Sequence, residues 1–248
     1  MPSPHDNRAG TPAEKTERLL EQPGGSLLVR PEYAGQAHCD WFRPQWWGAS
    51  ARPVASGGRG SAWFIQHDAG NWVLRHYSRG GMVARVSQRT YGYTGAERVR
   101  SFAEFRLLNR MVELGLPVPE PVAAFYQRRT AMAYQAAILV RTIPDAVTFA
   151  DQLPDHPPRL WRDLGHLIRR FHDQGIDHPD LNCHNVLISR QSLYLIDFDK
   201  GQMRQGDVSS PWARKNLERF WRSVRKQGVE PSPEQRDAFD RGYYRVCL

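Results

Sequence analysis

Three polar residues with suggestive spacing lie near the middle of the second half of this sequence. Asp180 is followed five residues later by Asn185 and twelve residues after that by Asp197. Two short apolar runs, 186–188 and 193–196, separate Asn185 from Asp197, and a hairpin of these runs would bring all three side chains to one site. Phosphoryl transfer from a nucleotide needs this set, because one Asp positions the attacking hydroxyl and accepts its proton while an Asn and a second Asp hold Mg²⁺. We therefore predict that Asp180 is the catalytic base and that Asn185 and Asp197 are metal ligands.

The complete order of these residues resembles the catalytic loop and metal-binding Asp of the protein-kinase-like superfold. The motif H-x-D-x-x-x-x-N extends from His178 to Asn185. A predicted strand, a turn at 189–192 and a second predicted strand follow it, and Asp197-Phe198 comes directly after them. His-x-Asp alone is weak, and an ordinary hairpin could contain both apolar runs, but the whole order is much harder to reach by chance. The resemblance implies an α+β, bilobal fold with a small β-rich N-terminal lobe carrying one main helix and a larger, mainly helical C-terminal lobe.

The composition is that of a soluble globular protein. The chain has 248 residues, of which 40% are apolar, enough for one bilobal domain with a packed core. The longest uninterrupted apolar run, 136–140, is far shorter than a membrane span. Residues 1–25 lack the apolar segment of a signal peptide, and we expect a flexible tail there. Cys39, Cys183 and Cys247 do not have metal-ligand spacing, so we expect reduced thiols in the cytoplasm.

Positive charge is carried almost entirely by arginine. The formal net charge is +8, and only four of the 34 basic residues are lysines. Residues 75–110 contain eight arginines against two glutamates, which favours a surface for an acidic substrate or an anionic membrane. A GC-rich genome would also raise the arginine content. No recognised nucleic-acid-binding motif is present, so we do not predict a nucleic-acid partner.

A glycine-rich turn precedes the strand 62–65. Gly57, Gly58 and Gly60 would let the backbone approach nucleotide phosphates and present N–H groups to them. Most glycine-rich turns are plain hairpin turns, but the position upstream of a catalytic loop gives this one more weight. We predict that these three glycines cover the phosphates.

The lysine with which ordinary kinases grip those phosphates is absent, because the chain has no lysine between positions 15 and 200. Arg75, at the end of the predicted strand 72–75, is the best substitute, since its charge is permanent and its planar fork can serve both a phosphate and a carboxylate. Glu104 lies beside the apolar stripe of a predicted helix, where a carboxylate should be paired. The resemblance to kinases, in which a helix glutamate pairs with the strand lysine, implies that Arg75 is its partner. The alternative is an exposed Glu104 on an arginine-rich helix.

The remaining elements follow the order that the superfold requires. We predict an N-lobe over 26–143 that binds nucleotide, a hinge at 141–144, and a C-lobe over 144–248 that contains the catalytic loop and binds the acceptor. The aromatic segment 41–47 suits a membrane interface or a sugar-binding surface, or else packs the small lobe, and the sequence leaves this open. The apolar periodicities and their glycine endpoints predict helices over about 94–115, 160–175, 212–224 and 231–248.

Four features together resemble the bacterial 3-deoxy-D-manno-octulosonic acid (Kdo) kinases, and the likeness extends from about Trp47 to Gly201. They are the turn 58–60, the segment 72–77 leading into 79–81, the loop 178–185, and the segment 195–199. The resemblance implies a kinase that uses ATP and Mg²⁺ to phosphorylate the O-4 hydroxyl of a Kdo residue on Kdo-lipid A, in lipopolysaccharide core biosynthesis. It also implies a peripheral protein on the cytoplasmic face of the inner membrane. An acceptor with a sugar carboxylate and lipid phosphates would account for the arginine surplus.

Other functions remain as alternatives. One is another kinase of the superfold, such as a lipopolysaccharide heptose kinase or an aminoglycoside-type phosphotransferase. A second is a non-catalytic pseudokinase that binds an anionic glycolipid. A regulated protein kinase is disfavoured, because Pro179 replaces the arginine that receives an activation-loop phosphate and no Ala-Pro-Glu sequence follows Asp199. Asp199 itself, where protein kinases have Gly, has no role that the sequence defines.

Overall fold

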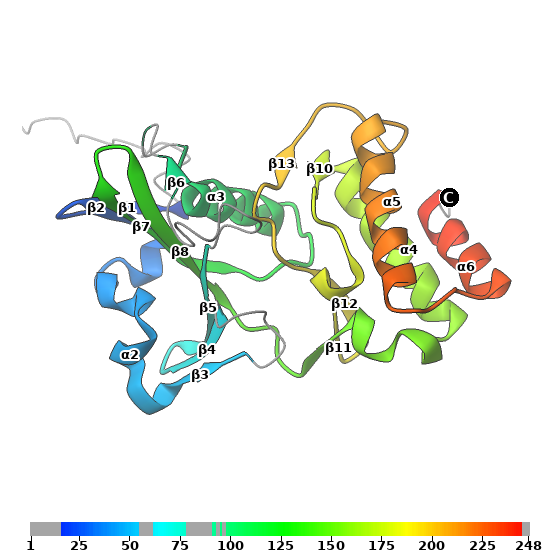
Figure 1. Ribbon diagram of the computed structural model, residues 1–248, viewed down its shortest axis with the longest axis horizontal. Coiled ribbons are helices and arrows are strands. Elements are labelled where there is room, and N and C mark those ends of the chain that lie inside the picture. Colours follow the sequence, from blue (N-terminus) through cyan, green and yellow to red (C-terminus); the bar gives the residue numbers. More distant parts are fainter. Residues whose placement is uncertain (1–15, 55–61, 78–90, 93–94, 96–97, 245–248) are drawn as a thin grey trace, which may run out of the picture. The chain divides into compact units, whose positions relative to one another are not determined.

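The computed structural model describes residues 16–54, 62–77, 91–92, 95 and 98–244, which form two compact units (Figure 1). The N-terminal unit comprises the chain up to Phe105 together with Pro121–Arg141, and the C-terminal unit comprises Arg106–Glu120 and the chain from Thr142 onward. The division thus falls at the predicted hinge, but it differs from the predicted lobes in giving 106–120 to the second unit.

Hydrogen bonds explain that difference. The Leu195 N–H donates to the carbonyl of Pro117 at 3.1 Å, and the Arg170 guanidinium donates to the carbonyl of Gly115 at 2.7 Å. The connector after the helix is therefore tied to elements of the C-terminal unit rather than to the sheet.

The described part of the N-terminal unit is built around an antiparallel sheet. Its strand order is β1-β2-β7-β8-β5-β4-β3, with β6 paired to β8. The strands are β1 (Arg18–Gln22), β2 (Gly25–Val29), β3 (Ala51–Pro53), β4 (Ala62–His67), β5 (Gly70–His76), β6 (Tyr91–Gly92), β7 (Pro121–Thr130) and β8 (Ala133–Arg141).

The predicted flexible tail over residues 1–25 is wrong for its last part. Arg18–Gln22 forms β1, which pairs along its whole length with β2 through a turn at Gly24, whose φ is +76°. All five residues of β2 are buried, and β1 covers its outer edge. β1 is an edge strand, and it gains its order from pairing with β2 and from Leu20, which packs against the apolar core.

The aromatic segment 41–47 packs on one face of this sheet. Trp41 and Phe42 are 3% exposed and belong to the same apolar core as Trp72 and Leu74 of β5. Trp47 packs against that core, and its Nε1 donates to the carbonyl of Trp41 at 2.8 Å. Of the uses that the sequence left open, packing within the small unit is the one observed. The exception is Trp46, which is 52% exposed.

Helix α3 (Arg100–Glu113) follows the sheet's first six strands in the chain. Its buried side presents Phe102, Phe105 and Leu108, and the hydroxyl of Ser101 donates to the carbonyl of Phe125 on β7 at 3.0 Å. Gly115 follows the helix with φ +66°, a left-handed conformation that favours glycine, as the sequence predicted. The predicted helix start near residue 94 lies outside the described residues.

The C-terminal unit is mainly helical. Its long helices are α4 (Pro158–Asp173), α5 (Pro211–Lys226) and α6 (Pro233–Tyr244), at the positions that the sequence predicted. Gly165 and Gly242 allow α4 and α6 to approach so closely that a Cβ on either would collide with the backbone of the other helix. The described part of the chain contains no helix of the length and apolarity needed to cross a membrane.

Short strands complete this unit. β11 (Val186–Ser189) and β12 (Ser192–Leu195) form the predicted hairpin, with Val186 opposite Leu195, and β9 (Ala146–Thr148) pairs with the other edge of β11. β10 (Ile176–Asp177) pairs with β13 (Gln202–Met203). The loop 178–185 therefore leaves one small sheet and enters another, which fixes both of its ends.

Candidate active site

The loop 178–185 is folded by its own side chains. The Oδ1 atom of Asn182 accepts from the N–H groups of His184 and Asn185, at 2.9 and 3.2 Å, and so caps the short 3-10 helix Cys183–Asn185. The Nδ2 atoms of Asn182 and Asn185 both donate to the carbonyl of Asp180, at 2.8 and 3.0 Å. The backbone of Asp180 is thus held by two amides, while its side chain is exposed.

The hairpin brings the second predicted acid to this loop. The Ile196 N–H donates to the carbonyl of Asn185 at 3.0 Å, and the His178 Nε2 bonds to the carbonyl of Ile196 at 3.0 Å. The residue directly before Asp197 is therefore tied to both ends of the loop that contains Asp180. Asn185 is also bonded to the Asp180 carbonyl, so hydrogen bonds join the backbone of the loop to the residue that precedes Asp197.

His178 has a structural place at this junction. Its side chain is fully buried, and burial lowers the pKa of the imidazole against the opposing effect of the bond to the Ile196 carbonyl. A neutral imidazole that donates from Nε2 fits this environment. The ring packs 4.5 Å from the ring of Phe198, which in turn stacks on Phe171 of α4 at 5.8 Å.

The backbone after the hairpin is strained. Asp197 has φ +64° and Lys200 has φ +83°, and a non-glycine residue in this left-handed region loses about 1–2 kcal/mol. Asp tolerates the conformation better than most residues, and such strain concentrates at functional sites. The buried ring of Phe198 and the 2.7 Å bond from the Gly201 N–H to the Phe198 carbonyl hold the turn.

Two residues of α5, which the catalytic motif does not include, position the loop. Asn216 is 2% exposed; its Oδ1 accepts from the N–H of His178 at 2.9 Å, and its Nδ2 donates to the carboxylate of Asp177 at 2.9 Å. The hydroxyl of Ser223 accepts from the N–H of Cys183 at 2.9 Å. The available signal was an Asn on the apolar face of the predicted helix 212–224, where a polar side chain must find a partner.

In the N-terminal unit, Arg75 and Glu104 form the predicted pair. The Arg75 Nη2 lies 2.5 and 2.6 Å from the two carboxylate oxygens of Glu104, which is only 4% exposed. The hydroxyl of Tyr77 donates to the same carboxylate. The alternative of an exposed Glu104 is therefore wrong. Gly57, Gly58 and Gly60 lie outside the described residues.

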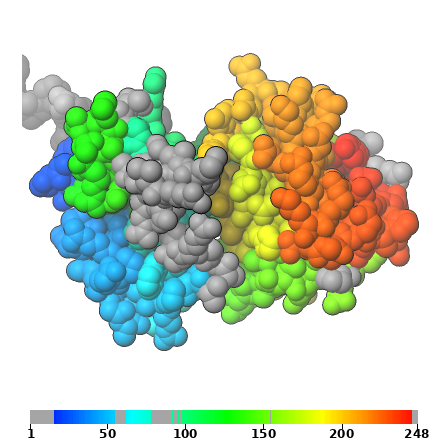
Figure 2. Space-filling model, in the orientation of Figure 1, coloured from blue at the N-terminus to red at the C-terminus, as the bar shows by residue number. Residues whose placement is uncertain are grey.

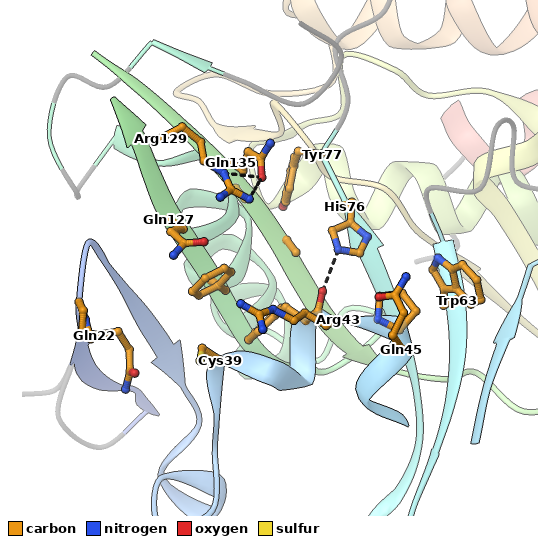
Figure 3. A pocket seen from close by; sticks show the side chains of 16 residues that line it. Gln22, Cys39, Arg43, Gln45, Trp63, His76, Tyr77, Gln127, Arg129 and Gln135 are labelled. Carbon is orange, nitrogen blue, oxygen red and sulfur yellow. Dashed lines mark hydrogen bonds between the residues drawn. The ribbon is translucent and has the colours of Figure 1, made fainter. Parts of the chain in front are cut away.

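A hollow of about 450 Å³ opens on the other face of this sheet (Figure 3). His76 lies on its wall, and because successive strand residues point to opposite faces, the hollow does not include Arg75. One wall is fixed by the bond of the His76 Nε2 to the Phe42 carbonyl at 2.9 Å, and the rim by Arg129, which donates to Gln135 at 2.6 and 2.9 Å. Tyr77 also lines the hollow and donates to Glu104, so the hollow adjoins the Arg75–Glu104 pair.

The side chains of His38, Cys39 and Asp40 also gather, with their potential ligand atoms within 4.8 Å of one another. The sequence analysis expected no metal site at any cysteine. His38 Nδ1 accepts from the Asp40 N–H at 3.3 Å, which caps the 3-10 helix Cys39–Phe42, and the same ring lies 3.0 Å from the Asp40 carboxylate. Cys39 and Cys183 are free thiols, and Cys247 lies outside the described residues.

Comparison with known proteins gives consistent matches. The model of the lipopolysaccharide kinase (Kdo/WaaP) family matches residues 44–243. A protein of Stenotrophomonas maltophilia named 3-deoxy-D-manno-octulosonic acid kinase is 45% identical over 230 residues, which cover 92% of this chain and 89% of that protein. Proteins of the same name from Xanthomonas oryzae pv. oryzae and Xylella fastidiosa are 44% and 40% identical, over 86% and 90% of this chain and 85% and 88% of theirs.

One solved structure shares the fold. It is described as WaaP in complex with acyl carrier protein, and it superposes with a TM-score of 0.56 at 17% identity, over 89% of each chain. With a β-rich first unit and a mainly helical second unit, this likeness confirms the predicted α+β, protein-kinase-like fold.

Replacing Asn216 with Leu should loosen the loop 178–185 without unfolding the protein. The change keeps the branching and the number of heavy atoms of the side chain but leaves the His178 N–H and the Asp177 carboxylate without this partner, at a cost of about 1–3 kcal/mol. Hydrogen–deuterium exchange should accelerate by about tenfold or more in the peptide that spans the loop. Arg214→Leu, at an exposed position of the same helix, is the control; equal protection in Asn216→Leu and wild type would contradict the positioning role.

Proposed function

Because the chain belongs to the lipopolysaccharide kinase (Kdo/WaaP) family, we propose that it transfers the terminal phosphoryl group of ATP to a hydroxyl of Kdo-lipid A. The acceptor atom in this proposal is the O-4 of a Kdo residue, and the step belongs to lipopolysaccharide core biosynthesis. The relatives named Kdo kinases, at 40–45% identity over most of the chain, support this acceptor over a heptose or an aminoglycoside. The observation that carries the activity is the hydrogen-bonded junction of the loop 178–185 with the hairpin that precedes Asp197.

Asp180 acts as the general base in this proposal. Its backbone is fixed by Asn182 and Asn185, and its exposed carboxylate is accessible to an acceptor hydroxyl. The acceptor oxygen forms a bond to the γ-phosphorus while the bond between that phosphorus and the ADP oxygen breaks. The hydroxyl proton passes to the Asp180 carboxylate.

The donor set of the junction fits a magnesium ion. Asn185 uses its Nδ2 on the carbonyl of Asp180, so the oxygen of the same amide is the atom suited to a cation, and Asp197 adds a carboxylate. Oxygen ligands of these two kinds are those that Mg²⁺ prefers. When bound there, Mg²⁺ would neutralise charge on the nucleotide phosphates.

Arg75 is the proposed phosphate-binding cation, in place of the usual lysine. Glu104 and Tyr77 hold one edge of this assembly, because the buried carboxylate accepts from both the guanidinium and the phenol. The planar guanidinium donates in several directions through a rigid fork, whereas a lysine ammonium acts as a compact point charge. Gly57, Gly58 and Gly60 are proposed to contribute backbone N–H groups to the same phosphates.

The second candidate, a pseudokinase that binds a glycolipid, has less support. A binding module does not need a base, an amide and a second acid in one hydrogen-bonded segment, whereas a kinase needs all three. Strain at Asp197, stabilised by the burial of Phe198, also favours a site built for chemistry.

We also propose that the protein is peripheral to the cytoplasmic face of the inner membrane, where a lipid-linked acceptor would be presented. With a net charge of +8, it should float with anionic vesicles and dissociate as salt rises, because the Debye length falls from about 10 Å at 0.1 M salt to about 3 Å at 1 M. Equal, salt-insensitive flotation with neutral vesicles would point instead to an apolar anchor at the exposed Trp46, and a Trp46→Ala variant would then lose it.

Asp180→Ala should lower turnover of Kdo-lipid A by about 10²–10⁴-fold, the usual effect of removing a general base. Binding of a fluorescent ATP analogue should stay close to that of the wild type, because Asp180 faces the acceptor in this proposal. The measurement is a radiolabel transfer assay from γ-labelled ATP. Near-normal turnover in the variant would remove Asp180 from the mechanism.

Arg75→Ala should weaken ATP use strongly, whereas Arg75→Lys should keep part of it, since the charge remains but the fork is lost. Glu104→Gln should cause a smaller loss by weakening the hold on Arg75. Kinetics at varied ATP concentration measure these effects, with Arg110→Ala on the exposed side of α3 as the matched control. A normal ATP Michaelis constant and normal turnover in Arg75→Ala would mean that another cation holds the phosphates.

A further inference from the structure

Four basic residues form one face of α5. Lys215, Arg219, Arg222 and Lys226 follow one another at intervals of four, three and four residues, and all four are exposed. At 3.6 residues per turn, this spacing places them within an arc of about 60° on the helix. We call these four residues the α5 basic face. In the view of Figure 2, α5 lies at the surface of its unit.

The α5 basic face adjoins the catalytic loop. A hollow of about 450 Å³ is lined on one side by the loop, including Asp180 and Asn185, and on the other by Arg219, Arg222 and Lys226. A second hollow of about 410 Å³ is lined by Arg219 and Lys215 together with residues that precede Asp180. Arg219 lines both hollows. The α5 basic face therefore extends from Arg219 toward both ends of the helix, beside the loop that contains Asp180.

The distance between this face and the loop is fixed. Asn216 and Ser223, which bond to the backbone at His178 and Cys183, lie on the flank of α5 next to the basic face. They are seven residues apart, or about 10 Å along the helix axis, and so attach the helix to the loop at two points. The basic side chains are therefore presented to Asp180 by a rigid support.

An ordinary solvated helix face would not have this charge pattern. Such faces usually mix signs, yet the only acid on α5, Glu218, lies outside the arc of the basic face. Throughout the described part of the chain, none of the four residues forms an ion pair with an acidic side chain. Lys215 with Arg219, and Arg222 with Lys226, are like-charge neighbours four residues apart, which weakens the helix slightly. An anionic ligand would offset that cost.

We propose that the α5 basic face is the subsite that binds the anionic groups of the acceptor. Arg219 and Arg222 would hold the carboxylate or phosphate nearest the reacting hydroxyl, because they line the hollow that contains Asp180 and guanidinium forks bind such groups through two donors. Lys215 and Lys226, about 16 Å apart along the axis, would reach further anionic groups of a large acceptor. This proposal rests on the proposed function, since it assigns the charges to the acceptor rather than to the nucleotide.

The test is the double variant Arg219→Gln/Arg222→Gln, assayed with Kdo-lipid A in micelles of a neutral detergent. The Michaelis constant for the acceptor should rise by about tenfold or more, while the Michaelis constant for ATP stays unchanged. Arg219→Lys/Arg222→Lys should recover part of the loss. The matched control is Arg214→Gln/Arg225→Gln, which removes the same charge from exposed positions of the same helix about 100° away from the basic face.

Three results would overturn the subsite. An unchanged acceptor Michaelis constant in the double variant would do so, as would an equal loss in the control, which would indicate net charge alone. A loss seen with anionic vesicles but absent in neutral micelles would assign the α5 basic face to the membrane surface instead. Thermal unfolding of each variant should match the wild type, because all the substituted residues are exposed.

Direct binding separates this proposal from the proposed function. Titration of the wild type and of the double variant with Kdo-lipid A in neutral micelles, without ATP, measures the subsite whether or not phosphate is transferred. If the wild type transfers no phosphate, the proposed kinase function fails, while binding that is present in the wild type and lost in the double variant still supports the subsite. If the wild type transfers phosphate and both proteins bind equally, the subsite alone fails.

Discussion

The side chain of Asn216 is buried and bonded at both ends, its oxygen to the His178 N–H and its nitrogen to the Asp177 carboxylate. A buried amide that lost either partner would leave a desolvated polar group, so α5 can sit against the loop 178–185 in only one register. Ser223 repeats this constraint two turns further along the helix. The geometry around Asp180 depends on it, together with the packing of the His178 ring on Phe198 and the burial of Leu181.

The same constraint gives α5 a second use. A helix whose inner side is locked to a catalytic loop also fixes the direction in which its outer side chains point. Charges on such a helix can be placed relative to a reacting atom with little loss of entropy on binding. Positioning of the proposed base and recognition of the proposed acceptor would then depend on one element, and the two would be altered together by any shift of α5.

In the N-terminal unit, the same need for hydrogen-bond partners applies to a buried charge, the carboxylate of Glu104. Glu104 is buried, and a buried carboxylate must be paired and hydrogen-bonded. Arg75 meets it with Nη2 against both oxygens, and Tyr77 adds a phenol donor. Arginine can replace the lysine of ordinary kinases here because the guanidinium is a wide, permanently charged donor. The phenol of Tyr77 adds a further hydrogen bond to the Glu104 carboxylate.

The sequence by itself determined the features that depend on short separations along the chain. The strand, turn and second strand between Asn185 and Asp197 form a hairpin, whose parts are adjacent in the sequence. The helix that ends before Gly115 requires only local apolar periodicity and a glycine in the left-handed conformation. Both could therefore be predicted. The Arg75–Glu104 pair was predictable only through the resemblance to kinases. The tertiary structure alone decided that Arg18–Gln22 is a strand, that the segment 41–47 packs inward, and that α5 holds the loop. These features join distant segments, and apolar periodicity shows which side of an element is buried but not which partner covers it.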